Sequence, residues 1–152
     1  MKQLIYVLLF IGIVIVDRVS KWLITYAGIT VCKVTAWLSW CLYYNRGVSW
    51  SFLHTEDTMP FVLVSLLVAF ITGIVAWQAY THLRHGDPIY GQLMVVAGSC
   101  SNLLDRVLYG GVIDFIYIHI GDWSFAVFNI ADVAIVLGVC VMFLQEVYRP
   151  DA

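Results

Sequence analysis

Charged residues are scarce in this chain of 152 residues. Asp, Glu, Lys and Arg together make up 12% of it, whereas hydrophobic residues make up 62%. An ordinary soluble domain is about 45 to 50% apolar, so the composition indicates an integral membrane protein. The net charge of −2 gives no support for nucleic-acid binding. The length suits one domain over residues 1–152, with about four membrane crossings and a small external feature.

Several motifs of known chemistry are also missing. The chain has no H-E-x-x-H sequence and no C-x-x-C pair. His82 and His85 stand three residues apart, but no further ligand pattern accompanies them, so neither a metal nor a cofactor is predicted. Cys32 and Cys41 fall in one loop and could form a disulfide if that loop faces an oxidising space; the sequence leaves this open.

Four apolar segments predict transmembrane helices at about 4–24, 59–81, 88–106 and 125–145. The first apolar segment follows the basic residue Lys2, an arrangement that is also typical of signal peptides. No small-residue cleavage pattern comes after it, so we interpret it as a transmembrane helix. The segment Thr58–Thr81 contains no charged residue. Pro88 is expected to start the third helix, where its missing N–H costs little.

Strands are predicted outside these helices, in the regions of about 28–57 and 111–122. The first region is rich in β-branched and aromatic residues, which favour strands at a membrane surface. In the second, Val112–Ile120 alternates along its length, with Asp114 at its head. The predicted fold class is therefore membrane α-helical, with four transmembrane helices and a small β-sheet cradle.

Three acids lie in otherwise apolar sequence: Asp105, Asp114 and Asp132. A carboxylate in hydrocarbon costs about 2.5 to 3.5 kcal/mol on insertion scales, so each needs a partner or a watery cavity. Asp132 is expected roughly six residues into its helix, about 9 Å below the start, and a turn could bring it beside Asp114. Two adjacent carboxylates share a proton, which suits one as base and one as acid. Alternatively, Asp105 pairs with Arg106, Asp114 caps a turn and Asp132 bonds to Asn129.

Further polar residues have helical spacing. Asn102 and Arg106 lie four residues apart and share a face of the third helix, as Asn129 and Asp132 share one of the fourth. Asp17 and Lys21 have the same four-residue spacing at the end of the first helix, so a helix-end ion pair worth a few tenths of a kcal/mol is expected.

At these residues the chain resembles lipoprotein signal peptidase, also called signal peptidase II. The segments that carry the resemblance are DRVSK, NRGVSWSF, NLLDR, GGVIDFI and FNIADVAI. The resemblance implies that Asp114 and Asp132 form a catalytic dyad. It also implies a set of supporting or substrate-binding positions, which fall on Asp17, Lys21, Asn45, Gly47, Asn102, Asp105, Arg106 and Asn129.

The resemblance implies an aspartic endopeptidase of the bacterial inner membrane that needs no metal or other cofactor. Its expected substrate is a diacylglyceryl-modified prolipoprotein, whose signal helix lies between the enzyme's helices and is cut before the lipid-modified cysteine. The enzyme is expected to contact membrane lipid and to act as a monomer. Its termini are expected in the cytoplasm, with the sheet and the active site on the extracytoplasmic side.

The distribution of basic residues disagrees with that orientation. The side of the termini carries Lys2, Arg84 and Arg149. The opposite side carries Arg18, Lys21, Lys33, Arg46 and Arg106. Counting these residues would place the termini outside. We adopt the orientation implied by the resemblance, because three of the five adjoin the expected site.

Other classes of protein explain less of the sequence. A proton-relay transporter would also keep three acids in the membrane, but nearer the midplane and often with internal repeats, which are not visible here. A serine–lysine protease needs a buried lysine, and Lys21 is already explained by Asp17. A purely structural membrane protein explains the helices but not the polar motifs.

Overall fold

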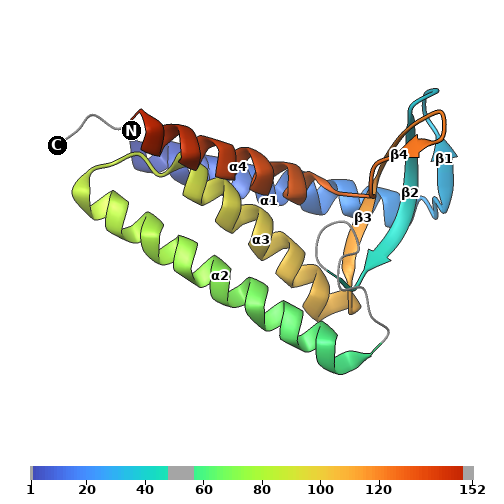
Figure 1. Ribbon diagram of the computed structural model, residues 1–152, viewed down its shortest axis with the longest axis horizontal. Helices are drawn as coiled ribbons and strands as arrows, with labels where there is room; N and C mark the ends of the chain where they lie inside the picture. The colour runs from blue at the N-terminus through green and yellow to red at the C-terminus, as the bar shows by residue number, and fades with distance from the viewer. Residues whose placement is uncertain (1, 48–56, 149–152) are drawn as a thin grey trace.

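The structure, a computed structural model, describes residues 2–47 and 57–148. In these ranges the chain forms four helices: α1 (Lys2–Tyr26), α2 (Thr58–His85), α3 (Tyr90–Tyr109) and α4 (Ile130–Val147). It also forms four short strands: β1 (Val31–Lys33), β2 (Leu38–Asn45), β3 (Val112–Ile120) and β4 (Trp123–Ser124). The strands make one antiparallel sheet in the order β1-β2-β3-β4 at one end of the helices, while α1 begins and α4 ends at the other end (Figure 1).

Three of the helices, α1, α2 and α4, are long and apolar enough to cross a membrane. Their outward side chains are large and apolar: Leu63 is 60% exposed, Phe70 67% and Val136 62%, which suits contact with lipid. The helix α3 is less apolar because it packs against the other three and turns its polar residues inward. The predicted membrane α-helical fold with a small sheet is confirmed.

Two predicted helix boundaries near the loop at Gly86 are wrong. The residues from His82 to His85 continue α2 instead of forming a polar loop. Gly86 then ends the helix in the left-handed conformation, with φ of 85°, and its N–H donates to the carbonyl of Leu83. Pro88 lies two residues before α3 instead of starting it.

Close packing of α3 on α4 depends on glycine. A Cβ atom on Gly98 would lie 2.5 Å from the carbonyl oxygen of Ala131, and one on Gly138 would lie 2.7 Å from that of Gly91. Small residues at these points let the two backbones approach, as is common between membrane helices. The contact at Gly98 fixes the first turn of α4 against the middle of α3.

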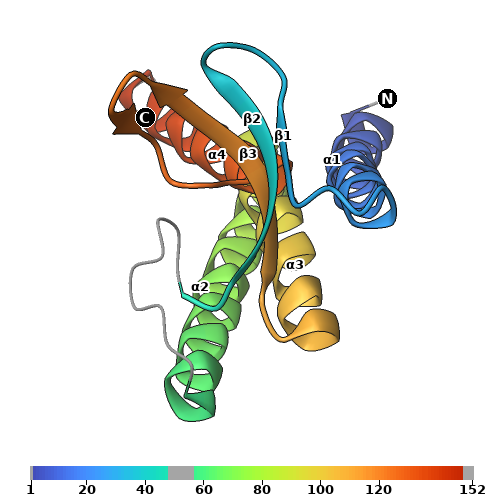
Figure 2. The same cartoon turned by 90° about the vertical axis from the view of Figure 1, so that its right-hand side faces the viewer.

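The sheet lies across the ends of the helices, with β2 and β3 side by side (Figure 2). The predicted strand Val112–Ile120 is confirmed, and its first residue pairs with Asn45 at the end of β2. Cys32 stands opposite Trp40, one register position away from Cys41, so the two thiols point to opposite faces of the sheet. Both cysteines are free, and the possible disulfide is not formed.

Candidate active site

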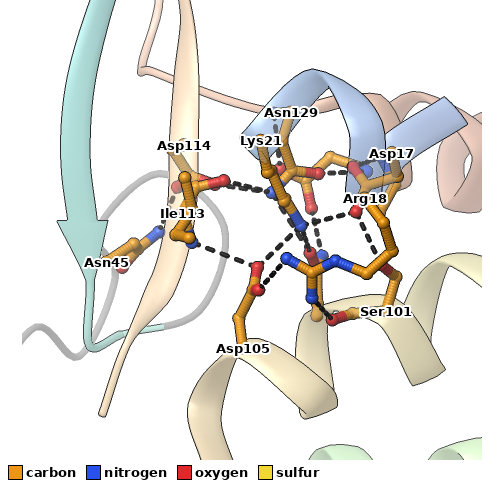
Figure 3. Close-up of polar contacts among 12 residues, drawn as sticks. Asp17, Arg18, Lys21, Asn45, Ser101, Asp105, Ile113, Asp114 and Asn129 are labelled. Atoms are coloured by element: carbon orange, nitrogen blue, oxygen red, sulfur yellow. Dashed lines mark hydrogen bonds and ion pairs between the residues drawn. The ribbon is translucent and has the colours of Figure 1, made fainter. Parts of the chain in front are cut away.

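Four acids gather where the sheet meets the helices. Asp114 is the third residue of β3, and Asp17 and Asp105 come from α1 and α3 (Figure 3). Asp132 lies in the first turn of α4. The site therefore forms only when three helices and the sheet come together. Its place at one end of the helices differs from the midplane position expected of a proton relay.

Asp114 is held by two side-chain amides. Its Oδ2 accepts a hydrogen bond of 3.0 Å from Nδ2 of Asn45, and its Oδ1 accepts one of 2.7 Å from Nδ2 of Asn129. The side chain of Asn45 also accepts from the backbone N–H of Gly47, at 2.9 Å. Both ends of the Asn45 amide are therefore engaged inside the protein, which favours orientation of Asp114 over direct contact with a substrate.

The start of α4 differs from the prediction and changes the depth of Asp132. The helix begins at Ile130 and not near Phe125, because Phe128 pairs with Ile116 of β3 and keeps that stretch extended. Asn129 caps the helix: its Oδ1 accepts from the N–H of Asp132 at 2.9 Å, and Oδ2 of Asp132 accepts from the N–H of Asn129 at 3.2 Å. Asp132 is thus in the first turn, not about 9 Å below it.

Two asparagines connect the carboxylates of Asp114 and Asp132. Nδ2 of Asn129, besides reaching Asp114, lies 3.1 Å from Oδ1 of Asn102. Nδ2 of Asn102 in turn donates to Oδ1 of Asp132, at 2.9 Å. The predicted bond between Asn129 and Asp132 therefore exists, but as one part of a network that also fixes Asp114. Asn129 is fully buried, so these bonds have no competition from solvent.

A buried ion cluster of Asp17, Lys21 and Asp105 contacts this network through Asn102. Nζ of Lys21 lies 2.7 Å from Asp17 and 2.7 Å from Asp105, and it donates to Asn102 at 2.9 Å. All three charged residues have side chains that are 0% exposed. The expected pair of Asp17 with Lys21 is confirmed. The alternative pairing of Asp105 with the neighbouring arginine is wrong, because Asp105 binds Arg18 at 2.6 Å.

Each acid of the cluster also holds one backbone amide next to the dyad. Oδ1 of Asp17 accepts from the N–H of Ala131, at 2.8 Å, and Oδ2 of Asp105 accepts from the N–H of Ile113, at 3.2 Å. Ala131 immediately precedes Asp132, and Ile113 immediately precedes Asp114. Lys21 binds both acids, so one buried ammonium ties together the two backbone segments that carry the dyad (Figure 3).

The carboxylates of Asp114 and Asp132 line one cavity of about 190 Å³. Its walls come from α2, α3 and α4 and from the facing ends of β2 and β3. Arg106 lines it too and donates to the carbonyl oxygen of Gly47, which joins the end of α3 to the segment after β2. The structure thus brings together every predicted site residue: Asp17, Lys21, Asn45, Gly47, Asn102, Asp105, Arg106, Asp114, Asn129 and Asp132.

Burial raises the pKa of Asp114 to about 7, and the negative charge of Asp132 adds to the rise. Hydrogen bonds from Asn45 and Asn129 and the charge of Lys21 oppose that rise. A carboxyl group with a pKa near 7 can hold its proton at neutral pH and give it up during a reaction. Asp114 is therefore suited to hold and release a proton in acid–base chemistry.

Two participants were absent from the predicted site. Arg18 binds Asp105, and Ser101 donates from its Oγ to Oδ2 of Asp17 at 2.6 Å. Their signals were present in the sequence, since Arg18 adjoins Asp17 and Ser101 adjoins Asn102 within an apolar helix. Among the described residues, no group of three or more His, Cys, Asp or Glu side chains is placed to hold a metal ion. Residues 48–52 of the NRGVSWSF segment lie outside the described ranges.

The chain is similar to known proteins over most of its length. Over residues 9–148 the sequence matches the family described as signal peptidase (SPase) II. The lipoprotein signal peptidase of Buchnera aphidicola subsp. Acyrthosiphon pisum is 36% identical over 148 residues, which cover 93% of this chain and 90% of that protein. That of Dichelobacter nodosus is 35% identical over 153 residues and covers 97% of both chains. A bacterial membrane enzyme solved by the in meso method at 2.3 Å resolution has a TM-score of 0.74 at 25% identity, over 96% of this chain and 91% of the other.

Proposed function

Because this chain belongs to the signal peptidase II family of lipoprotein signal peptidases, we propose that Asp114 and Asp132 are its catalytic residues. Members of the family are aspartic peptidases that cleave signal peptides from prolipoproteins, and this chain is a multi-pass bacterial membrane protein with that function. The observation that carries the proposal is the shared cavity, in which the carboxylates of Asp114 and Asp132 are joined through Asn102 and Asn129.

The dyad enters the reaction with one proton, held by Asp114, whose pKa lies near 7. The carboxylate of Asp132 takes a proton from water as the water oxygen bonds to the scissile carbonyl carbon. Asp114 gives its proton to the carbonyl oxygen, so a tetrahedral diol forms. When the C–N bond breaks, the proton on Asp132 moves to the leaving nitrogen. Asp114 recovers a proton from the diol as the new carboxyl group forms.

The ion cluster supplies positioning in this scheme. Asp17 and Asp105 hold the backbone amides beside the two catalytic residues, and Lys21 fixes the distance between those amides. Asn45 orients Asp114, and Arg106 fixes the segment at Gly47 that borders the cavity. The substrate is a prolipoprotein carrying a diacylglyceryl group, cut just before the lipid-modified cysteine. One chain of residues 1–152 acts as a single domain and a monomer, because it supplies every one of these groups.

Cleavage of a diacylglyceryl-modified prolipoprotein in detergent tests the dyad. We expect Asp114→Asn and Asp132→Asn each to lower kcat by about 10⁴-fold or more, as loss of a group that transfers protons does in other peptidases. Asp122→Asn is the matched control, because Asp122 is an exposed acid in the turn between β3 and β4. A folded Asp114→Asn or Asp132→Asn variant that cleaves at the wild-type rate would show that the assignment is wrong.

We further propose that the termini are cytoplasmic and the sheet extracytoplasmic. Three basic residues on the sheet side, Arg18, Lys21 and Arg106, are bound inside the site and do not act as free topological signals. Without them, three basic residues remain on the terminal side, namely Lys2, Arg84 and Arg149, and two on the sheet side, namely Lys33 and Arg46. The remaining balance favours cytoplasmic termini.

The exposed thiol of Cys32 on β1 gives a direct test of this orientation. We expect a membrane-impermeant maleimide to label Cys32 in intact spheroplasts, with Cys32→Ser as the control that identifies the label. Labelling of Cys32 only after the membrane is opened would support the reverse orientation.

A further inference from the structure

A second and larger cavity, of about 800 Å³, lies at the end of the helices far from the sheet. It is lined by residues of α2 and α4, by the loop after α2 and by Gln92 near the start of α3. Its apolar lining includes Met142 and Phe143. Its polar lining comes from Gln78, His82, Asp87, Gln92, Gln145 and Glu146. Nothing in the proposed reaction uses these residues.

The lining of this cavity offers acceptors and negative charge. Of the described residues around it, those with a full charge at neutral pH are Asp87 and Glu146, and both are acidic. Gln92 is only 2% exposed, yet its Oε1 accepts no hydrogen bond from the described residues, and the buried Oε1 of Gln145 accepts none either. A buried acceptor without a donor is unfavourable, because it has lost its hydrogen bonds to water. The cavity is therefore suited to a cationic group that carries N–H donors.

His82 is the basic residue among those that line the cavity. Its Nδ1 lies 3.5 Å from Nε2 of Gln92, whereas Oε1 of Gln92 has no donor among the described residues. Arg84 and His85 lie at the end of α2, are exposed and do not line the cavity.

The cavity lies in line with the dyad. Both cavities are walled by α2 and α4: Thr72 and Ile135 border the dyad cavity, and Gln78 and Val139 border the second one further along the same helices. Asp132 and Glu146 mark the two ends of this line on α4. Their separation of 14 residues corresponds to about 21 Å at a rise of about 1.5 Å per residue.

The h-region of a signal peptide has a length similar to the separation of Asp132 and Glu146 along α4. A positively charged n-region precedes an apolar h-region of about 7 to 15 residues, which spans about 10 to 22 Å as a helix. A signal peptide whose cleavage site lies at the dyad, with its h-region along α2 and α4, therefore places its n-region at the second cavity. Given cytoplasmic termini, this end of the enzyme also faces the compartment in which the n-region stays.

We propose that this cavity is the docking site for the basic n-region of the substrate, and the proposal rests on the function and orientation given above. Asp87 and Glu146 pair with a lysine or arginine side chain of the n-region. The amide oxygens of Gln92 and Gln145 accept hydrogen bonds from the same group. With this site, the enzyme recognises its substrate at two positions, the cleavage site and the n-region.

Matched substrates test the proposal. One lipidated prolipoprotein carries two lysines in its n-region, and its partner carries two glutamines at the same positions. We expect the wild type to cleave the lysine substrate with a kcat/KM about three- to tenfold higher at low salt, through KM, because partly exposed ion pairs contribute modestly. Asp87→Asn/Glu146→Gln should abolish this preference and leave kcat/KM for the glutamine substrate unchanged. Gln92→Leu should reduce the preference with kcat unchanged.

The controls separate this proposal from the proposed function. Asp122→Asn, which removes an acid at the sheet end, should keep the full preference for lysine. Equal cleavage of the two substrates by the wild type would overturn the docking site while leaving the peptidase assignment intact. An equal loss on both substrates in the double variant would also overturn it, since that result indicates a structural role. A wild type that cleaves neither substrate would instead contradict the proposed function.

Discussion

Replacement of Lys21 by methionine tests the ion cluster most directly. Methionine has a similar length and no charge, so Lys21→Met keeps most of the packing and removes the ammonium between Asp17 and Asp105. Both carboxylates are 0% exposed, so water cannot take the place of the lost cation. Asp105 retains Arg18 at 2.6 Å, whereas Asp17 forms an ion pair with Lys21 alone among the described residues.

The expected size of the effect follows from this arrangement. Removing one partner of a buried ion pair costs about 3 to 5 kcal/mol, because the other charge stays buried without compensation. Lys21→Met should lower the free energy of unfolding by that amount. In Lys21→Met/Asp17→Asn the uncompensated charge is gone, and the asparagine oxygen can still accept from Ala131. The double variant should therefore recover about 1 to 2 kcal/mol.

Denaturant unfolding in detergent micelles, followed by near-UV circular dichroism, measures these differences, and cleavage assays on the folded fraction measure kcat. The single variant should lose kcat as well as stability, since Lys21 also holds Asn102 against the dyad. Lys33→Met is the matched control: Lys33 is exposed on β1, and its loss should change stability by less than about 0.5 kcal/mol. An unfolding free energy of Lys21→Met within 0.5 kcal/mol of the wild type, or a double variant less stable than the single one, would refute the reasoning.

Three further predictions follow from the same geometry. Asn129→Ala should cost about 0.5 to 2 kcal/mol of stability from the lost helix cap. Asn129→Asp keeps an oxygen that can cap the helix but replaces the Nδ2 donor to Asp114 with a carboxylate, so both variants should reduce kcat in cleavage assays. Gly98→Ala should cost about 1 to 3 kcal/mol by overpacking and should reduce kcat at equal folded fraction, whereas Gly12→Ala, with open space around it, should leave kcat unchanged. Because the pKa of Asp114 is raised to about 7, the native state binds more protons than the unfolded state from about pH 4 upward. The free energy of unfolding should therefore fall as pH rises from 4 to 7, and less so in Asp114→Asn; equal slopes in denaturation curves would contradict the shift.

Much of the fold could be predicted because the signals were local. The uncharged run Thr58–Thr81 predicted a helix, and the alternation of Val112–Ile120 predicted a strand; both are present. The start of the fourth helix was predicted wrongly because Phe125–Phe128 continues its apolar pattern. Pairing of Phe128 with β3 holds these residues in an extended form, and a long-range contact of this kind leaves no mark in local periodicity.

The site residues could be predicted more completely than their partners. Asp105, Asp114 and Asp132 could be identified because they are acids within apolar segments, and an acid in a membrane needs a polar or charged partner. The partner of Asp105 could not be predicted, since Arg18 lies 87 residues away in the sequence. Pairing of Asp105 with Arg106 conflicts with helix geometry, because adjacent residues of a helix point in different directions.

The position of Asp17 one helical turn before Lys21 bears on how the protein enters the membrane. α1 is synthesised before α3, so Lys21 can enter the membrane before Asp105 has been made. A lone ammonium in α1 would have no carboxylate partner in the bilayer during that interval. Asp17, 2.7 Å from Nζ, provides a counter-ion within the same helix. α1 can therefore integrate as a locally neutralised pair during translation, and Lys21 gains its second carboxylate when α3 arrives.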